Sequence, residues 1–137
     1  MRKFNYLVLA TLLLTAFVIS ASAEEEKAVV VPIASDGVQR LEMLGGEYFF
    51  KPKHIIVKIN VPVEIIIKKE AGVVPHNIVL KAPEAGIDIS ENLGTAPKTV
   101  RFTPTKKGKY EFTCDKKLLF FKSHKDRGME GILEVVE

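Results

Sequence analysis

A regular alternation of apolar and polar residues occupies the middle of the chain. From Ile55 to Ile67 every odd-numbered position is apolar, and the even-numbered positions include Lys58 and Glu64. A period of two is that of a β-strand, whose successive side chains point to opposite faces. Asn60-Val61-Pro62 lies at the centre of the run and is typical of a turn. The run therefore predicts two strands joined by a short turn.

The same alternation marks the second half of the chain. It predicts strands at Val74 to Leu80, around Val100 and Phe102, at Tyr110 to Cys114, and around Leu133 and Val135. The stretch from Ala82 to Pro97 is rich in Pro, Gly, Asp and Ser and is expected to be a long connection with room for one short helix. No helical periodicity is sustained after the N-terminal segment. These observations predict an all-β protein, a Greek-key antiparallel β-sandwich of two sheets.

The N-terminal residues are typical of an export signal. Arg2 and Lys3 precede an apolar run from Leu7 to Ile19, and Ala21-Ser22-Ala23 is the small-residue pattern of a signal-peptidase site. We expect residues 1–23 to be a signal peptide cleaved after Ala23, and the protein to be periplasmic or otherwise exported. Retention of the run as an anchor is the alternative, but the run is short for a membrane span. The protein is then not an integral membrane protein after cleavage.

Charge and length narrow the class of the mature protein. Loss of Arg2 and Lys3 lowers the formal charge from +3 to +1, and no concentrated basic face with interleaved aromatic residues is present, so a nucleic-acid partner is not expected. Residues 24–47 are expected to form an N-terminal tail and first strand region, and residues 48–137 a single domain. Cys114 is the one cysteine, and an exported thiol without a disulfide partner is best protected by a metal.

Four side chains form the donor set of a mononuclear copper site. Cys114, His124 and Met129 follow one another at the end of a predicted strand, and His76 lies upstream in Pro75-His76-Asn77. A thiolate and two imidazoles with a weak thioether are the ligands of a copper ion that passes single electrons. His76 and Cys114 each share the parity of buried apolar neighbours, so both are expected to face inward. His54 lies on the polar parity and is expected to be a surface side chain.

The motifs around these donors resemble those of the cupredoxins, the small blue-copper proteins such as plastocyanin and azurin. The resemblance rests on the segments Tyr48 to Pro52, Pro75-His76-Asn77, Gly108 to Cys114, His124 and Gly128 to Gly131, and covers the chain from about Tyr48 to Val135. It implies one copper ion per chain with His76, Cys114 and His124 as equatorial ligands and Met129 as the axial ligand. It also implies that Asn77 hydrogen-bonds across to the cysteine loop.

The loop between Cys114 and His124 departs from the family pattern. Nine residues separate the two, more than is usual in small electron carriers of the family, and the type 1 domain of the copper nitrite reductases is more similar in this respect. The extra residues include four consecutive apolar side chains, Leu118, Leu119, Phe120 and Phe121, with lysines on both sides. Two interpretations are open: a lid that excludes water from the copper, or an exposed patch where a redox partner docks.

These features predict an exported type 1 copper protein that carries single electrons by Cu(I)/Cu(II) cycling. Its expected partners are redox proteins such as a c-type cytochrome or a terminal reductase or oxidase. Alternatives are a copper-handling protein (chaperone, store or sensor) and a copper centre that binds a small molecule. An enzyme is not expected and no catalytic residue is predicted, because copper oxidases and nitrite reductases need further histidines for additional copper ions and this chain has three in all.

Overall fold

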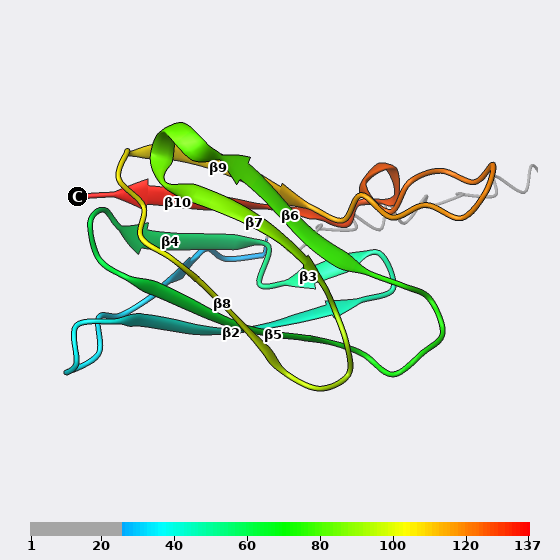
Figure 1. The fold of residues 1–137 in the computed structure, drawn as a ribbon, viewed down its shortest axis with the longest axis horizontal. Coiled ribbons are helices and arrows are strands. Elements are labelled where there is room, and N and C mark those ends of the chain that lie inside the picture. The colour runs from blue at the N-terminus through cyan, green and yellow to red at the C-terminus, as the bar shows by residue number, and fades with distance from the viewer. Residues whose placement is uncertain (1–25) are drawn as a thin grey trace, which may run out of the picture.

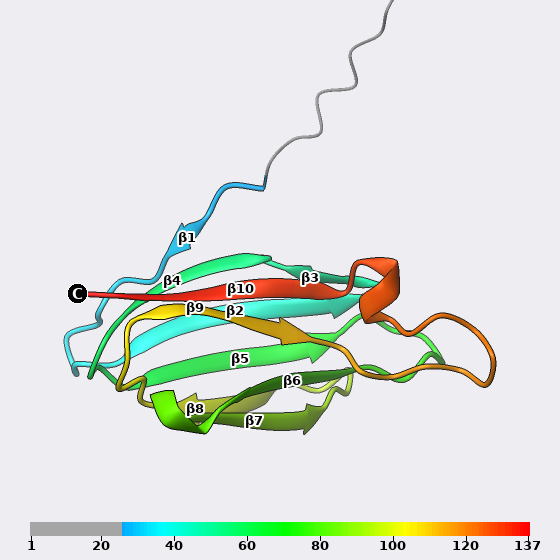
Figure 2. The ribbon, with the colours of Figure 1, turned by 90° about the horizontal axis from the view of Figure 1, so that it is seen from above.

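The computed structural model describes residues 26–137, so the expected signal peptide and its cleavage site lie outside the described residues. Ten strands form two sheets that pack face to face (Figures 1 and 2). The six-stranded sheet has the order β1-β4-β10-β9-β6-β7, and the four-stranded sheet the order β3-β2-β5-β8. The strands are β1 (Val29–Val30), β2 (Gln39–Gly46), β3 (Phe49–Lys51), β4 (His54–Lys58), β5 (Val63–Lys69), β6 (Asn77–Ala82), β7 (Ile87–Asn92), β8 (Lys98–Phe102), β9 (Gly108–Thr113) and β10 (Glu130–Val136).

The all-β sandwich predicted from the sequence is confirmed, but the strand pairing is mixed rather than purely antiparallel. β1 pairs with β4, β4 with β10, and β2 with β5 in parallel, while the remaining pairs are antiparallel. The final strand, β10, lies between β4 and β9, and it runs parallel to β4 and antiparallel to β9. Residue alternation predicts that a segment is a strand, and it carries no information on the direction of its neighbours.

The central alternating run forms β4 and β5 as predicted. Asn60 has the left-handed φ of 58° in the turn between them, a conformation that asparagine tolerates better than most residues. Its backbone N–H donates to the Pro104 carbonyl at 2.7 Å. This bond fixes the turn to the loop between β8 and β9.

Two parts of the chain are more regular than the sequence indicated. The connection predicted from Ala82 to Pro97 contains the short 3₁₀ helix η1 (Pro83–Ala85) and also a full strand, β7, along which Ile87 and Ile89 face the core. β2, within the segment expected to precede the domain, pairs with both β3 and β5 in the four-stranded sheet. Residues 39–46 are therefore part of the body of the sandwich.

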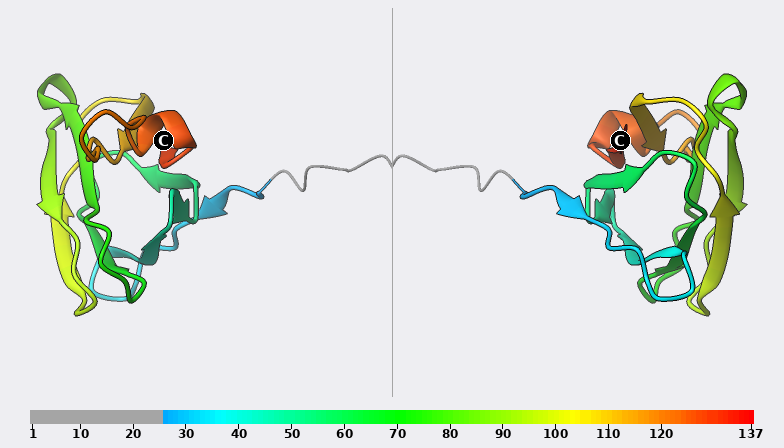
Figure 3. Two further views of the ribbon diagram at one scale, coloured as in Figure 1. Left: turned by 90° about the vertical axis from the view of Figure 1, so that its right-hand side faces the viewer. Right: turned by 90° about the vertical axis from the view of Figure 1, so that its left-hand side faces the viewer.

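The core lies between the two sheets, which the end-on views place on opposite sides of it (Figure 3). Phe50 and Phe112, from opposite sheets, meet edge to face with ring centroids 5.3 Å apart. Gln39 is also fully buried, and its side chain donates to the Lys58 and Val61 carbonyls and accepts from the Lys58 N–H at 2.6 Å. A buried amide with its donor and acceptor both used can fasten the start of β2 to the turn after β4 without leaving an unpaired polar group.

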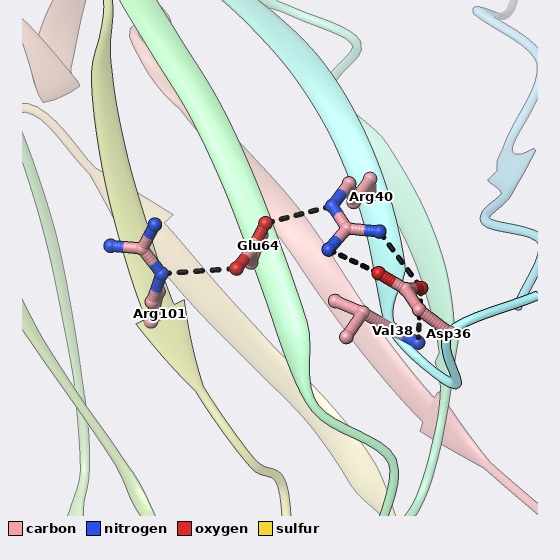
Figure 4. Close-up of polar contacts among 5 residues, drawn as sticks. All are labelled: Asp36, Val38, Arg40, Glu64 and Arg101. Carbon is pink, nitrogen blue, oxygen red and sulfur yellow. Dashed lines mark hydrogen bonds and ion pairs between the residues drawn. The ribbon is translucent and has the colours of Figure 1, made fainter. Parts of the chain in front are cut away.

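The outer face of the four-stranded sheet carries a row of charges. Arg40 on β2, Glu64 on β5 and Arg101 on β8 are cross-strand neighbours, and both arginines donate to the Glu64 carboxylate, at 2.8 and 3.0 Å (Figure 4). Arg40 also pairs with Asp36. Hydrogen bonds from Arg101 and Arg40 lower the pKa of Glu64.

Within residues 26–137, no helix has the length and apolar character needed to span a membrane.

Candidate metal centre

The predicted donors meet at one end of the sandwich because of the strand register. Val79 of β6 lies opposite Thr113 of β9 in an antiparallel pair, and continuing that register by two residues sets Asn77 opposite Asp115. His76, which directly precedes β6, is thereby brought to the cysteine that follows β9. Glu130 of β10 lies opposite Thr113 on the other side, which places Met129 beside Cys114. Three segments that are distant in sequence therefore end at the same place.

The two histidines and the cysteine form a compact, buried cluster. Their potential ligand atoms all lie within 4.8 Å of one another. The Nδ1 atoms of His76 and His124 are 3.1 Å apart, and the Cys114 Sγ lies 3.4 Å from His124 Nδ1 and 4.0 Å from His76 Nδ1. Such separations suit donors that share one ion, given metal–nitrogen bonds of about 2.0 Å and metal–sulfur bonds of about 2.3 Å as in zinc sites. Cys114 is 0%, His76 5% and His124 4% exposed.

His124 is held by a short turn that follows it. The 3₁₀ helix η2 (Lys125–Arg127) ends at Gly128, whose φ of 96° is in the left-handed region that favours glycine. This reversal lets the Met129 N–H donate to the His124 carbonyl at 3.0 Å, while the Cys114 N–H donates to the Met129 carbonyl at 3.0 Å. The three donors of the C-terminal segment are thus linked through their own backbones.

Asn77 joins the two halves of the site. Its side-chain amide donates to Asp115 Oδ1 at 2.7 Å and accepts from the Asp115 N–H at 3.1 Å. Its backbone N–H points to the Cys114 Sγ at 3.4 Å. These contacts hold the residue after His76 against the residue after Cys114. A backbone N–H directed at the sulfur stabilises the thiolate and restrains its position.

Burial is the main cause of the pKa shifts of His76, His124 and Cys114, and in each case it favours the uncharged form. Burial, followed by the charges of His124 and Lys69, lowers the pKa of His76 to about 4. Burial and then the charge of Arg127 lower the pKa of His124. Both rings are therefore biased toward the neutral form that binds a metal. Burial raises the pKa of the Cys114 thiol, although N–H groups of Asn77 and Lys116 act in the opposite sense, so metal binding at this site must release the thiol proton.

Met129 is fully buried beside the cluster, in a space bounded by a glycine. A Cβ atom placed on Gly45 of β2 would lie 3.4 Å from the Met129 methyl group and 3.0 Å from Leu93 Cδ1. The absence of a side chain on Gly45 therefore leaves room for the thioether. No sequence pattern indicates this contact, because Gly45 belongs to the opposite sheet.

Two residues that the sequence did not assign to the site, Tyr48 and Arg127, lie on one side of His124. The Tyr48 ring meets the His124 ring edge to face, with centroids 5.1 Å apart, and the Arg127 guanidinium lies 4.6 Å from the centroid of the Tyr48 ring. Tyr48 has a φ of 64°, an uncommon conformation for an aromatic residue. The stack covers one side of the histidine and fixes its orientation.

The four apolar residues of the long loop divide between two positions. Leu118 and Phe121 line a small pocket beside His124 together with Tyr48 and Arg127. Leu119 and Phe120 are 73% and 102% exposed, and even Leu118 and Phe121 are more than half exposed. The segment therefore covers the histidine in part while most of its apolar surface faces solvent.

His54 lies outside the cluster. It is half-buried on β4 and its Nε2 lies 2.8 Å from Glu134 Oε2 on the neighbouring β10. Within residues 26–137, His76, Cys114 and His124 form the only group of three or more His, Cys, Asp or Glu residues placed to hold a metal ion.

A β-sandwich with one cysteine and two histidines converging at its end, and a buried methionine beside them, defines a copper site, because thiolate, imidazole and thioether are the donors that copper prefers. The chain belongs to the cupredoxin-like family, whose domain matches residues 7–128. The donor set and the family together support one copper ion as the cofactor. A search of curated proteins gives no match.

Solved structures share the fold at low sequence identity. The metal binding domain of the Cu(I)-exporting P-type ATPase CopA of Streptococcus pneumoniae, with Cu(I), has a TM-score of 0.63 and 24% identity over 82% of this chain and 98% of that one. Reduced auracyanin from Roseiflexus castenholzii has a TM-score of 0.54 and 21% identity over 72% and 97% of the two chains. Auracyanin A, a blue copper protein from Chloroflexus aurantiacus, has a TM-score of 0.53 and 22% identity over 73% and 100%.

Proposed function

We propose that the protein is an exported electron carrier in which one copper ion, held by His76, Cys114, His124 and Met129, alternates between Cu(I) and Cu(II). The observation that carries the proposal is that the donors are buried and that hydrogen bonds join the segments that supply them. All four donors are buried, and the Asn77–Asp115 hydrogen bonds tie the two segments that supply them. A site that moves little between oxidation states favours rapid electron exchange, since little reorganisation accompanies the transfer.

The remaining chemistry of the site follows from this chain's own residues. The bound ion supplies a one-electron couple when present. His76 and His124 would hold the ion through Nδ1 as neutral rings, and Cys114 would hold it as a thiolate after losing its proton. Apolar neighbours exclude water, which limits exchange of ligands and of the ion. Its redox partners would be proteins such as a c-type cytochrome or a terminal reductase or oxidase, and catalysis within the chain is not proposed.

The second candidate function is copper handling, as a chaperone, store or sensor. It is favoured by the similarity to a copper-exporting ATPase domain described with Cu(I). The burial of both histidines favours the carrier, because handling requires the ion to enter and leave. A copper centre that binds a small molecule is a further alternative and would need an open coordination position.

The experiment that separates these functions is optical and paramagnetic resonance spectroscopy of the protein loaded with Cu(II). An intense thiolate-to-copper charge-transfer band, abolished in Cys114→Ser and in His76→Ala, is the result expected of the carrier. His54→Ala is the matched control, since that histidine lies outside the cluster, and its band should be unchanged. A colourless protein whose copper is removed rapidly by a chelator would instead support handling.

A further inference from the structure

The tip of the loop between Cys114 and His124 is an apolar projection. Four consecutive side chains, Leu118, Leu119, Phe120 and Phe121, are 61%, 73%, 102% and 59% exposed. The loop extends beyond the end of the sandwich that carries the metal centre (Figure 2). An exposure of 102% at Phe120 means that no neighbouring side chain among the described residues flanks its ring. Exposing a cluster of large apolar residues in water is unfavourable and marks an interaction site.

The base of this projection is held in place. The His124 N–H donates to the Lys116 carbonyl at 2.8 Å, and the Lys125 N–H donates to the Cys114 carbonyl at 3.1 Å. Ser123 and Asp126 exchange further hydrogen bonds beside it. At the tip, the Phe121 N–H donates to the Leu118 carbonyl and closes a tight turn. The apolar side chains are therefore presented on a defined turn.

The turn contains a residue that is unfavourable for its conformation. Leu119 has a φ of 48°, in the left-handed region where glycine or asparagine is preferred and a bulky side chain is uncommon. Glycine would relieve the turn but would remove an exposed apolar group. The presence of leucine at this position indicates that its side chain contributes something other than the stability of the turn.

The polar groups around the tip are basic. Lys116 and Lys117 precede the four apolar residues and Lys122 follows them, and none of the three makes an ion pair within residues 26–137. Of the acids beside the loop, Asp115 is hydrogen-bonded to Asn77 and Asp126 to Ser123. The projection therefore presents an apolar end with unpaired positive charge at its base.

We propose that this loop inserts into the surface of an anionic membrane, with Leu118–Phe121 among the acyl chains and the lysines at the phosphate groups. Leucine and phenylalanine on one side with lysine on the other is the composition of segments that lie in the lipid interface. Lysines near an anionic leaflet each add to the attraction. From sequence, a lid and a docking patch for a redox protein are both open, and a redox encounter needs only a small contact. A lipid surface is favoured here because the exposed apolar tip with lysines at its base is complementary to acyl chains below anionic phosphate groups.

This inference goes beyond the proposed function and does not depend on it. Insertion of the loop would orient the molecule with its metal centre toward the membrane, since the loop joins Cys114 to His124. Whatever protein exchanges electrons or copper with the centre would then be met at the membrane surface.

The test uses the absence of tryptophan from the chain. Phe120→Trp introduces a single fluorophore at the tip, and the copper-loaded protein is titrated with vesicles of phosphatidylcholine containing phosphatidylglycerol. We expect a blue shift of the emission and quenching by brominated acyl chains. In 0.5 M salt, the apparent affinity for the vesicles should fall by about tenfold or more. The matched control is Ile33→Trp, which places the fluorophore at an exposed apolar position before the start of β2, at the end of that strand away from Met129. The emission of this variant should not change.

Two variants assign the effect to the projection. Phe120→Ser removes one exposed ring and should weaken binding of the otherwise unaltered protein to anionic vesicles by about tenfold. Lys117→Glu should weaken it as well, whereas Lys106→Glu, which makes the same change of charge in the β8–β9 loop, should not. Unchanged emission of Phe120→Trp with anionic vesicles overturns the proposal. So does a shift produced by a soluble c-type cytochrome in place of lipid, which would assign the loop to a protein partner.

Discussion

Asn77 and Asp115 exchange two hydrogen bonds across the metal end of the sandwich. One residue follows His76 and the other follows Cys114, and they are 38 positions apart in sequence. The pair aligns the two segments before any metal binds. Preorganisation of this kind lowers the conformational entropy that a metal site loses when its ligands are fixed.

Replacement of Asn77 should therefore loosen the site. Asn77→Ala removes both hydrogen bonds and should lower the free energy of unfolding of the metal-free protein by about 1–2 kcal/mol. It should also shift the thiolate-to-copper band, because the cysteine loop is no longer held. Chemical denaturation and visible spectroscopy measure the two effects. Asp115→Asn keeps an acceptor oxygen and the backbone N–H, so it should change both much less, and equal effects of the two variants would contradict this account.

Gly45 is expected to set the space available to Met129. Gly45→Val places branched carbons where even a Cβ would lie 3.0 Å from Leu93 and 3.4 Å from Met129, and overpacking of this kind costs about 1–3 kcal/mol. Displacement of the thioether should change the reduction potential of the copper, measured by voltammetry. Gly94→Val is the control, because a Cβ there would meet no atom closer than 3.9 Å. An unchanged potential in Gly45→Val would mean that Met129 does not contact the ion.

Tyr48 is expected to slow the loss of copper. Its ring covers His124 and is itself covered by Arg127, so Tyr48→Ala should open that side of the site to water. The rate of copper removal by a chelator should rise by about tenfold, as for loss of roughly 1.4 kcal/mol of protection. Tyr48→Phe keeps the ring and should exchange copper at the original rate. Equal rates in all three proteins would show that the ring does not limit access.

The charge row on the four-stranded sheet should make stability depend on pH in the acid range. Hydrogen bonds from Arg101 and then Arg40 hold the pKa of Glu64 below its ordinary value of 4.5. A carboxyl with a lowered folded-state pKa stabilises the fold above its unfolded value, and this contribution is lost as the pH falls through the folded-state value. Glu64→Gln should therefore be less stable than the original protein above about pH 5, and the difference should shrink below pH 4.5.

Thermal unfolding from pH 3 to pH 7 measures this dependence. Because the row is exposed to solvent, the expected effect is small and should weaken further in salt. Glu84→Gln is the control, since Glu84 makes no ion pair within the described part of the chain. A constant difference between Glu64→Gln and the original protein across this range would contradict the prediction.

The sequence predicted the parts of the fold that depend on local pattern. Alternation located β4, β5, β8, β9 and β10, and the types of the donor residues led to the buried cluster of His76, Cys114 and His124. What the pattern missed depends on contacts between distant segments. The direction of β10 beside β4, the buried amide of Gln39 and the closeness of Gly45 to Met129 are each set by pairing or packing that no window of sequence contains.

The loop beyond Cys114 shows the same limit from another side. Its composition identified an apolar segment but left two interpretations open, because exposure is a property of the folded molecule. Likewise Tyr48 could be named as part of a family motif from sequence, but its contact with His124 required the turn between β2 and β3 to be seen in place.

The hydrogen bond between the His124 N–H and the Lys116 carbonyl has a consequence for how this protein can change over time. It closes the loop at its base. The seven residues from 117 to 123 can therefore vary in length and composition while the copper ligands keep their positions. The affinity for the metal and the surface to which the loop binds can therefore be selected, or engineered, independently of each other.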